Sequence, residues 1–267
     1  MFESHIKRWR LVADGEPIVT HCSHLLPVLW NGKPAMLKLS SDEAERAGGA
    51  LMQWWDGGGA AKVYEHDAEA VLLERAMGKQ SLLRMAAGAE DDAASRIICA
   101  TVARLHAPRR DQPPALIPLS RWFRELAPAA NTHGGTLVEC SRIAEELLAS
   151  PIDPVVLHGD IHHGNILDFE ADGWLAIDPK GLIGERGFDY ANTFVNEELA
   201  TIAHPGRLQR QLAIVASEAR FPPKRLLQWI AAYAGLSAAW FLGDGSVDKA
   251  ESPLSVARIA LNELRQG

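Results

Sequence analysis

The stretch VVLHGDIHHGNIL, residues 155–167, places three histidines, one aspartate and one asparagine between two short apolar runs. Three kinds of site use these residue types: a metal centre built from histidines, a loop for phosphoryl transfer, and a polar surface loop. His162 and His163 are adjacent, so in a strand or tight loop they point to opposite sides, and at most one can join His158 on a single ion. A metal-dependent hydrolase is therefore the less favoured alternative, and so is a purely solvated loop.

Phosphoryl transfer accounts for more of the residue types. The attacking hydroxyl needs a carboxylate beside it, and the phosphates need Mg²⁺, which prefers carboxylate and amide oxygens. Asp160 and Asn165 supply one of each from a single loop. A second carboxylate is then needed nearby, and Asp178 ends the short apolar run of WLAIDPKG, residues 174–181. Two short strands and a turn can bring these three side chains to one cleft.

The rest of the chain changes character near residue 76. Before it, WRLVADGEPIVT (9–20) and LLPVLWNGKPAMLKLS (25–40) each have a turn signal between apolar runs, which predicts two hairpins. A helix is expected to start near residue 41, and short strands are expected around residue 63 and over 70–73.

After residue 80 the apolar spacing becomes helical, as in Ile97, Ile98, Val102 and Leu105. Short strands return over residues 154–178, and helices continue to the end. The sequence predicts an α+β protein with a small β-rich N-terminal lobe (1–76) and a larger helical C-terminal lobe (77–267).

The paired motif H-G-D-x-H-x-x-N and I-D resembles the signature of aminoglycoside phosphotransferases and related small-molecule kinases, which parallels the catalytic elements of protein kinases. Four further stretches are similar to the streptomycin 6-kinase branch, which is grouped with hydroxyurea-resistance kinases. These stretches are WWDGGGAAKV (54–63), ARLHAP (103–108), GWLAIDPKGLIGERGFDYAN (173–192) and GLSAAWFLGDG (235–245). The resemblance spans residues 8 to about 245 and implies a two-lobed protein-kinase-like fold with the active site between the lobes.

The resemblance implies roles for the residues of the motif. Asp160 would be the catalytic base that orients the substrate hydroxyl, and Asn165 and Asp178 would bind Mg²⁺. His158 would anchor the loop. His162 stands where protein kinases carry a lysine facing the transferring phosphate, so it would donate a hydrogen bond there or serve the structure. His163 is expected to face solvent.

Residues of the N-terminal lobe would bind the nucleotide, ATP or GTP. Lys38 is the single charge within an apolar strand and matches the lysine that contacts the α- and β-phosphates; on composition alone it could also be an edge-strand lysine reaching water. Its expected partner is Glu45, chosen over Asp42 and Glu43. No G-x-G-x-x-G is present, so THCSHLLP (20–27), with Ser23, would cover the phosphates. The backbone of Glu74 and Ala76 would bind the adenine edge.

The substrate implied by the resemblance is streptomycin, phosphorylated on a hydroxyl, with position 6 expected. Its two guanidinium groups call for carboxylates. Glu197, Glu198 and Asp244 are the candidates, and Asp189 is expected to tie the loop after Asp178 to the helical lobe. A kinase for hydroxyurea or for a metabolite alcohol would share the catalytic residues and stays open. A non-catalytic kinase-like binding protein is disfavoured because Lys38 and the three motif residues are all present.

The composition of the chain limits the kinds of molecule that we expect the protein to bind and the compartment in which we expect it. The formal net charge of −7 disfavours nucleic acid and is compatible with a cationic substrate. No apolar run long enough for a membrane span is evident, and the N-terminus has no signal-peptide pattern. Three cysteines without a C-x-x-C pair fit a reducing cytoplasm. We therefore expect a cytoplasmic monomer that binds neither nucleic acid nor membrane.

Overall fold

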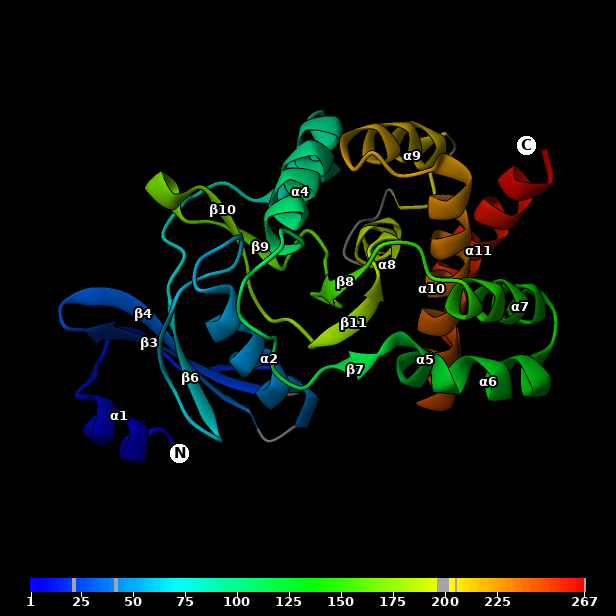
Figure 1. The fold of residues 1–267 in the computed structure, drawn as a ribbon. Helices are drawn as coiled ribbons and strands as arrows, with labels where there is room; N and C mark the ends of the chain where they lie inside the picture. The colour runs from blue at the N-terminus through cyan, green and yellow to red at the C-terminus, as the bar shows by residue number, and fades with distance from the viewer. Residues whose placement is uncertain (21–22, 41–42, 196–201, 205, 267) are drawn as a thin grey trace.

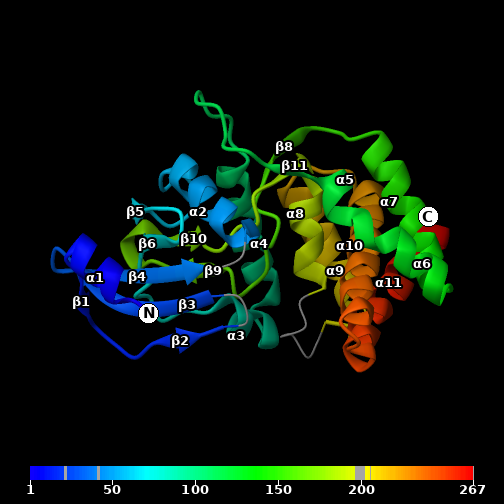
Figure 2. The ribbon, with the colours of Figure 1, turned by 90° about the horizontal axis from the view of Figure 1, so that it is seen from below.

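The computed structural model describes residues 1–20, 23–40, 43–195, 202–204 and 206–266, while the side chains of residues 40 and 43–46 lie outside that description. Figures 1 and 2 show a β-rich part that holds the N-terminus beside a larger helical part that holds the C-terminus. The predicted α+β class with helices concentrated after the N-terminal strands is confirmed.

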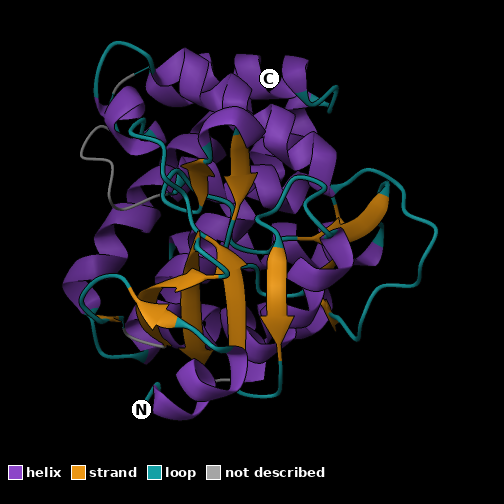
Figure 3. Ribbon diagram, turned by 90° about the vertical axis from the view of Figure 1, so that its left-hand side faces the viewer, coloured by secondary structure: helices purple, strands orange, loops and turns teal. Residues whose placement is uncertain are grey.

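An antiparallel sheet of six strands forms most of the N-terminal part, and its strands lie near the N-terminus in Figure 3. The strands follow the order β1-β3-β4-β6-β5, and β2 also pairs with β3. Their bounds are β1 (Val12–Ala13), β2 (Ile18–Val19), β3 (Ser23–Trp30), β4 (Lys33–Ser40), β5 (Val63–His66) and β6 (Ala70–Glu74).

One of the two predicted hairpins is confirmed and the other is wrong. Strands β3 and β4 are joined through Asn31 and Gly32, which both have positive φ (50° and 77°), as a tight hairpin turn requires. Residues 9–20 form no hairpin, because β1 and β2 do not pair with each other. Both instead pair with β3, at Leu29 and Val28 for β1 and at Leu25 and His24 for β2, so they form one interrupted edge.

Helices make up most of the remaining chain. Their bounds are α1 (Glu3–Trp9), α2 (Glu43–Trp55), α3 (Leu82–Ala87), α4 (Asp91–Leu105), α5 (Leu119–Trp122), α6 (Leu126–His133), α7 (Thr136–Ala149), α8 (Gly187–Ala191), α9 (Arg207–Glu218), α10 (Pro223–Gly243) and α11 (Val247–Gln266). Short 3₁₀ turns are η1 (Phe123–Glu125), η2 (Glu170–Asp172) and η3 (Asn192–Phe194). Helices α2 and α4 were expected from the sequence, whereas α1 was not.

Five short strands lie within the helical part and carry the predicted motif. Strand β9 (Ile166–Asp168) pairs with β10 (Trp174–Ala176), and β11 (Leu182–Glu185) pairs antiparallel with β8 (Pro154–Leu157) and parallel with β7 (Ile117–Pro118). The motif loop, residues 158–165, runs from β8 to β9. Asp178 and the residues that follow it run from β10 to β11.

The hydrophobic core continues across the predicted boundary at residue 76. Trp55 of α2 and Val71 and Leu73 of β6 belong to the same cluster of buried side chains as the helices of the C-terminal part. A second, smaller cluster fills the opposite side of the N-terminal sheet and includes Val28 and Leu37. The sheet therefore separates two cores, and one of them is shared with the helical part.

Helix α10 is long and apolar enough to cross a membrane, with 72% of its most apolar window buried inside the protein. It packs against α7, α8 and α11 at the centre of the helical part (Figure 1). Trp229, Tyr233 and Phe188 meet there edge to face, with ring centroids 5.4–5.9 Å apart. Burial within this core explains the apolar length of α10.

Helix α2 lies directly against the segment that follows Asp178. A Cβ atom on Gly48 would stand 2.2 Å from the carbonyl oxygen of Pro179, and one on Gly49 would stand 2.9 Å from His66 Nε2. Glycine at both positions therefore lets the helix approach the loop and strand β5 more closely than any side chain would allow. The position of α2 is coupled in this way to the backbone beside Asp178.

Candidate active site

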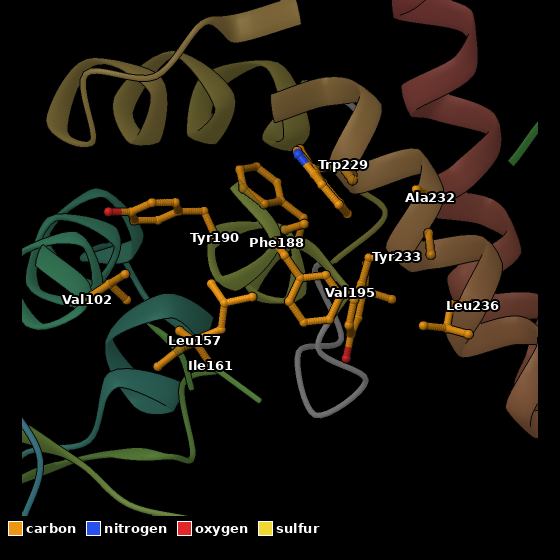
Figure 4. Close-up of a cluster of buried hydrophobic side chains, with 14 of the residues drawn as sticks. Val102, Leu157, Ile161, Phe188, Tyr190, Val195, Trp229, Ala232, Tyr233 and Leu236 are labelled. Carbon is orange, nitrogen blue, oxygen red and sulfur yellow. The ribbon is translucent and has the colours of Figure 1, made fainter. Parts of the chain in front are cut away.

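The motif loop is anchored in the core at three points. Leu157, Ile161 and Ile166 are at most 1% exposed, and Figure 4 shows Leu157 and Ile161 among the buried side chains beside α8. Gly159 has φ of 88°, and a Cβ there would lie 2.8 Å from the side chain of Leu182. Because apolar side chains on both sides of Asp160 are fixed, the carboxylate is presented from a rigid loop.

His158 holds the loop through its own ring. Its Nε2 donates to the carbonyl of Ile177 (2.9 Å), and its Nδ1 accepts from the backbone N–H of Asp160 (3.2 Å). Complete burial lowers the pKa of the imidazole, so the ring is neutral with its proton on Nε2. His158 therefore connects the motif loop to the end of β10 and has no lone pair for a metal.

Asp189 of α8 fixes the other side of the same loop. Its carboxylate accepts hydrogen bonds from the backbone N–H groups of His158 (2.9 Å) and Gly159 (2.8 Å) and pairs with Nε2 of His106 (2.8 Å). These hydrogen bonds and the facing histidine lower the pKa of this completely buried group, against the effect of burial. We expected Asp189 to hold the loop after Asp178, but it holds the loop that carries Asp160.

Asp160 is partly exposed, with 27% of its side chain accessible. Its Oδ1 accepts a hydrogen bond from the amide of Asn192 in η3 (3.1 Å), and its Oδ2 lies 3.6 Å from Nζ of Lys180. Its backbone carbonyl accepts from Nδ2 of Asn165 (2.9 Å). One carboxylate oxygen is thus held by an amide, and the other lies beside an ammonium group in the cleft.

Pairing between β9 and β10 brings Asn165 and Asp178 together. The register places Ile166 opposite Ala176, and the backbone N–H of Ile177 donates to the carbonyl of Asn165 (2.9 Å). Asp178 follows at once with φ of 64°, an uncommon conformation for a residue with a side chain. Strain of this kind is concentrated at functional sites.

Lys38 extends from β4 and forms an ion pair with Oδ1 of Asp178. Lys38 is 8% exposed, so the ion pair offsets the cost of burying its charge. The expected partner, Glu45, lies on α2, but its side chain is outside the described residues. The structure therefore brings Lys38 and Asp178 together and does not test the Lys38–Glu45 pair.

A cavity of about 270 Å³ opens beside this ion pair, between the N-terminal sheet and strand β9. Lys38 and Asp178 lie at one end, with Ser23 and Thr20, and the segment from Glu74 to Ala76 lies along another side. Its apolar walls are Leu25, Met36, Leu73, Leu167, Phe169 and Ile177. The cavity can hold a flat ring between apolar side chains beside a strip of backbone, with charged groups at the end.

The other two histidines of the motif differ from each other. Nδ1 of His162 accepts from the N–H of Gly164 (3.1 Å), and the ring is partly exposed next to Asp160. The expectation that His163 faces solvent is wrong, because His163 is 2% exposed. Burial and the nearby Arg207 lower the pKa of His163 to about 4. Its place in the core depends on packing against distant residues, which the loop sequence does not reveal.

The structure does not test whether the candidate substrate residues lie together. Glu197 and Glu198 lie outside the described residues, and Asp244 is exposed at the C-terminal end of α10. Trp240, near the same end of α10, packs edge to face on Trp122 with centroids 5.6 Å apart. The geometry therefore leaves the substrate contacts as predictions.

Sequence reasoning missed several residues of the site. Asn192 and Lys180 contact Asp160, and Phe169 and Leu167 form one wall of the cavity. Asn192 and Lys180 lie within the stretch GWLAIDPKGLIGERGFDYAN, which pointed to the family, but no pattern marked them as partners of Asp160. Leu167 lies in β9 and Phe169 directly follows the strand, and their spacing of two residues was a usable signal for side chains on one face.

The donor set fits a magnesium ion bound together with phosphates. Asp178 offers a carboxylate, and Asn165 donates through its nitrogen to Asp160, which leaves its amide oxygen as a ligand. Oxygen ligands of this kind suit Mg²⁺, which keeps few protein ligands when phosphates complete its shell. Within the described part of the chain, no group of three or more His, Cys, Asp or Glu side chains could hold a metal. A histidine-based hydrolase centre is not supported by this arrangement.

The β-rich part, the helical part and the cavity between them are typical of the protein-kinase-like fold. Asp178 at this cavity and Asp160, on the other side of Lys180, are the carboxylates that a small-molecule kinase needs. A crystal structure of a thermostable mutant of aminoglycoside phosphotransferase APH(4)-Ia, in ternary complex with ADP and hygromycin B, superposes with a TM-score of 0.67. The match covers 99% of this chain and 98% of that chain at 12% identity, which establishes the fold alone.

Residues 8–245 match the family model described as aminoglycoside/hydroxyurea antibiotic resistance kinase. The chain belongs to this family, as the resemblance in the sequence implied. The streptomycin 3''-kinase of Klebsiella pneumoniae is 51% identical over 90% of this chain and 92% of its own length. The streptomycin 6-kinase of Streptomyces griseus is 30% identical over 94% of this chain and 85% of its own length.

Proposed function

We propose that this protein transfers the γ-phosphoryl group of ATP to a hydroxyl of streptomycin and thereby inactivates the antibiotic. The observation that carries the proposal is an ion pair between Lys38 and Asp178 that lines the apolar cavity. Lys180 lies 3.8 Å from Asp178 and 3.6 Å from Asp160, and Asn165 donates to the backbone of Asp160, so the four predicted residues are close together. Phosphoryl transfer needs a base at the nucleophile, oxygen ligands for Mg²⁺ and a cation on the phosphates, and these four residues supply all three.

The cavity supports ATP as the phosphoryl donor. Its apolar walls would enclose the adenine, and the backbone from Glu74 to Ala76 would bind the adenine edge. Lys38 would contact the α- and β-phosphates, with Glu45 of α2 as its partner, and Ser23 would approach the phosphates from the start of β3. The APH(4)-Ia mutant whose fold this chain shares was crystallised with ADP.

Asn165 and Asp178 would hold Mg²⁺, which neutralises charge on the β- and γ-phosphates. Asp160 would accept the proton of the attacking hydroxyl, and its orientation by Asn192 suits this role. His162, through Nε2, would donate to the transferring group. Catalysis would arise from positioning and from neutralising charge, as is typical of phosphoryl transfer.

Streptomycin as the acceptor is supported by the names of the relatives and by the acidic charge of −7. Glu197, Glu198 and Asp244 are proposed to pair with its guanidinium groups. The relatives divide over the acceptor position: the one at 51% identity is named a 3''-kinase and the one at 30% identity a 6-kinase. The 6-hydroxyl expected from the sequence is thus one of two outcomes of product mapping.

The decisive experiment is an ATP-consumption assay across streptomycin, other aminoglycosides and hydroxyurea, with the product mapped by phosphorus NMR. Streptomycin-dependent turnover with one phosphorylated hydroxyl would support the proposal. Turnover with hydroxyurea alone would favour the second activity in the family's name. Protein without streptomycin-dependent turnover would refute the substrate and leave the kinase class intact.

Asp160→Ala tests the base. We expect kcat to fall by roughly 10²–10⁴-fold, because a general base contributes about that much, while ATP affinity measured by calorimetry stays near that of the wild type. Retained turnover would remove Asp160 from this role.

Asp178→Ala tests the metal site. We expect MgATP affinity to be lost while the helical content measured by circular dichroism is retained, because Asp178 would hold the ion that binds the phosphates. Unchanged MgATP affinity would exclude Asp178 as a ligand.

A further inference from the structure

Lys180 lies between the two carboxylates of the site. Its Nζ is 3.6 Å from Oδ2 of Asp160 and 3.8 Å from Oδ2 of Asp178. The opposite oxygens of these carboxylates face other groups, since Oδ1 of Asp160 accepts from Asn192 and Oδ1 of Asp178 pairs with Lys38. One ammonium group therefore faces both the proposed base and the proposed metal ligand.

Backbone pairing fixes this position. Leu157 of β8 pairs with Leu182 of β11, and the backbone N–H of Lys180 donates to the carbonyl of His158 (2.7 Å). A Cβ on Gly159 would lie 3.2 Å from the Cβ of Lys180, so the two segments are in close contact beside the base. The side chain of Lys180 is 20% exposed, and its stem is held against the loop while its charge reaches the cleft.

We propose that Lys180 is a catalytic residue that contacts the γ-phosphoryl group during its transfer, an inference that rests on the proposed function. The acceptor oxygen forms a bond to γ-phosphorus, the bond from γ-phosphorus to the β,γ-bridging oxygen breaks, and ADP leaves with the electron pair. The hydroxyl proton goes to Asp160. The transferring group would pass between Asp160 and Asp178, which is the place that Lys180 faces.

A cation fixed between Asp160 and Asp178 would stabilise the charge that develops on the transferring group. Negative charge spreads over the equatorial oxygens of the transferring group, and preorganised donors aimed at such charge are among the strongest catalytic devices. His162, two residues after the base, lies on the motif loop, where its Nδ1 accepts from Gly164. Lys180 approaches instead from the segment that precedes β11, and it brings an ammonium group.

A purely structural role makes different predictions. If Lys180 only offset repulsion between two carboxylates, its removal would weaken metal and nucleotide binding and destabilise the fold, and any cation nearby would substitute for it. A catalytic contact instead lowers kcat and leaves the binding of MgATP nearly unchanged, because the contact strengthens as charge develops in the transition state.

The first test compares Lys180→Met and Lys180→Arg with the wild type by steady-state kinetics. We expect Lys180→Met to lower kcat by about 100-fold or more, the scale for losing one preorganised donor, with the KM for ATP changed less than about threefold. Lys180→Arg should recover part of kcat. Lys7→Met, an exposed lysine on α1, is the matched control and should match the wild type.

A chemical rescue removes ambiguity about folding. Lys180→Cys treated with 2-bromoethylamine regains an ammonium group on a side chain of nearly the same length. Cys99 and Cys140 are buried, and burial raises the pKa of each thiol to about 12, so both resist alkylation. The treated wild type controls for Cys22. Restored kcat supports the proposal, and alkylated protein that stays inactive contradicts it.

Two results would overturn the inference: a kcat of Lys180→Met within about threefold of wild type, or a loss confined to MgATP affinity. Failure of the proposed function is recognised separately, because the wild type would then not phosphorylate streptomycin. In that case the same variants are compared by ATP hydrolysis without an acceptor, in which water replaces the hydroxyl. Lys180→Met should slow this hydrolysis as well, and unchanged hydrolysis would refute the role of Lys180.

Discussion

The side-chain amide of Asn192, which is buried, orients the carboxylate of Asp160, the proposed base. Asn192 is 6% exposed, and its amide is the donor that orients Oδ1 of Asp160. Without this donor the carboxylate can rotate, and a hydrogen bond to a charged group is worth about 1.5–3 kcal/mol. We therefore expect Asn192→Ala to lower kcat for streptomycin about tenfold or more, with the KM for ATP unchanged, as measured by steady-state kinetics.

The matched control for this substitution is Asn131→Ala, which removes an exposed amide from α6. Its kcat should equal that of the wild type. If Asn192→Ala also retained full kcat, orientation of Asp160 by this amide would be irrelevant to turnover.

At the residue scale, the sequence predicted the groups that a spacing can identify. The juxtaposition of Asp160, Asn165 and Asp178 followed from a motif and a short hairpin, and the structure brings these side chains to one place. Lys180 and Asn192 could not be predicted as partners of Asp160, because their approach depends on the β8–β11 register and on the position of η3. The burial of His163 was likewise hidden, because it depends on tertiary packing.

Helix α2 is the element whose position matters most to the site. Its Gly48 lies against Pro179, the residue after Asp178, with no room for a Cβ atom. Alanine is favoured over glycine within helices by about 1 kcal/mol, so on propensity alone Gly48→Ala would stabilise the protein. We expect the opposite, a lower melting temperature and a lower kcat, because the helix must move away from the loop that carries Asp178.

Gly243→Ala is the control at this scale. Gly243 is also a helical glycine, but its added Cβ would meet nothing within 4 Å. Calorimetry should therefore show no loss of stability for this variant. Equal melting temperatures for Gly48→Ala and the wild type would mean that α2 tolerates a shift without cost.

The elements themselves were predicted where local signals were strong. The β3–β4 turn was evident from Asn31 and Gly32, and the apolar face of α4 from its spacing. The first hairpin failed because Asp14 and Gly15 also suit a loop that returns the chain to the same neighbouring strand. Pairing partners of two-residue strands are decided by β3, which lies beyond any local pattern.

For the whole molecule, stability should depend on pH below neutrality. His158 and His163 are buried and neutral, with pKa values lowered from about 6.5 by burial. Below pH 6.5 the unfolded chain binds protons on both rings that the folded chain does not bind, so the unfolding free energy falls as the pH falls. For His163 the loss continues to about pH 4, its folded pKa, and amounts to at most about 3 kcal/mol.

Asp189 acts at lower pH in the same direction. Its folded pKa is lowered, so its stabilisation is complete above its unfolded value of 3.8 and is lost as the pH falls through the folded value. Urea unfolding at pH 7.5, 6, 5 and 4.5 measures the slope due to the histidines. His163→Asn should flatten this slope, whereas His133→Asn, on the exposed face of α6, should leave it unchanged. If His163→Asn left the pH dependence of the unfolding free energy unchanged, the proposed contribution of His163 would be contradicted.

The overall architecture was predictable because composition and spacing change along the chain near residue 76. The shared core was not predictable in this way, since Trp55 and Leu73 are ordinary apolar residues whose partners lie far along the sequence. The division of the chain into lobes at residues 76 and 77 therefore stays a prediction. The buried cluster that contains Trp55 and Leu73 extends across this boundary.

The interrupted edge of the N-terminal sheet, formed by β1 and β2, affects how readily the protein aggregates at high concentration. Val12, Ile18 and Val19 are 48–70% exposed, and a continuous apolar edge of this kind would recruit strands from other molecules. Here the two pieces are only two residues long, and Pro17, which lacks an N–H donor, stands between them. The break thus protects the protein against aggregation through strand addition, and a deletion that fused the pieces into one strand would remove that protection.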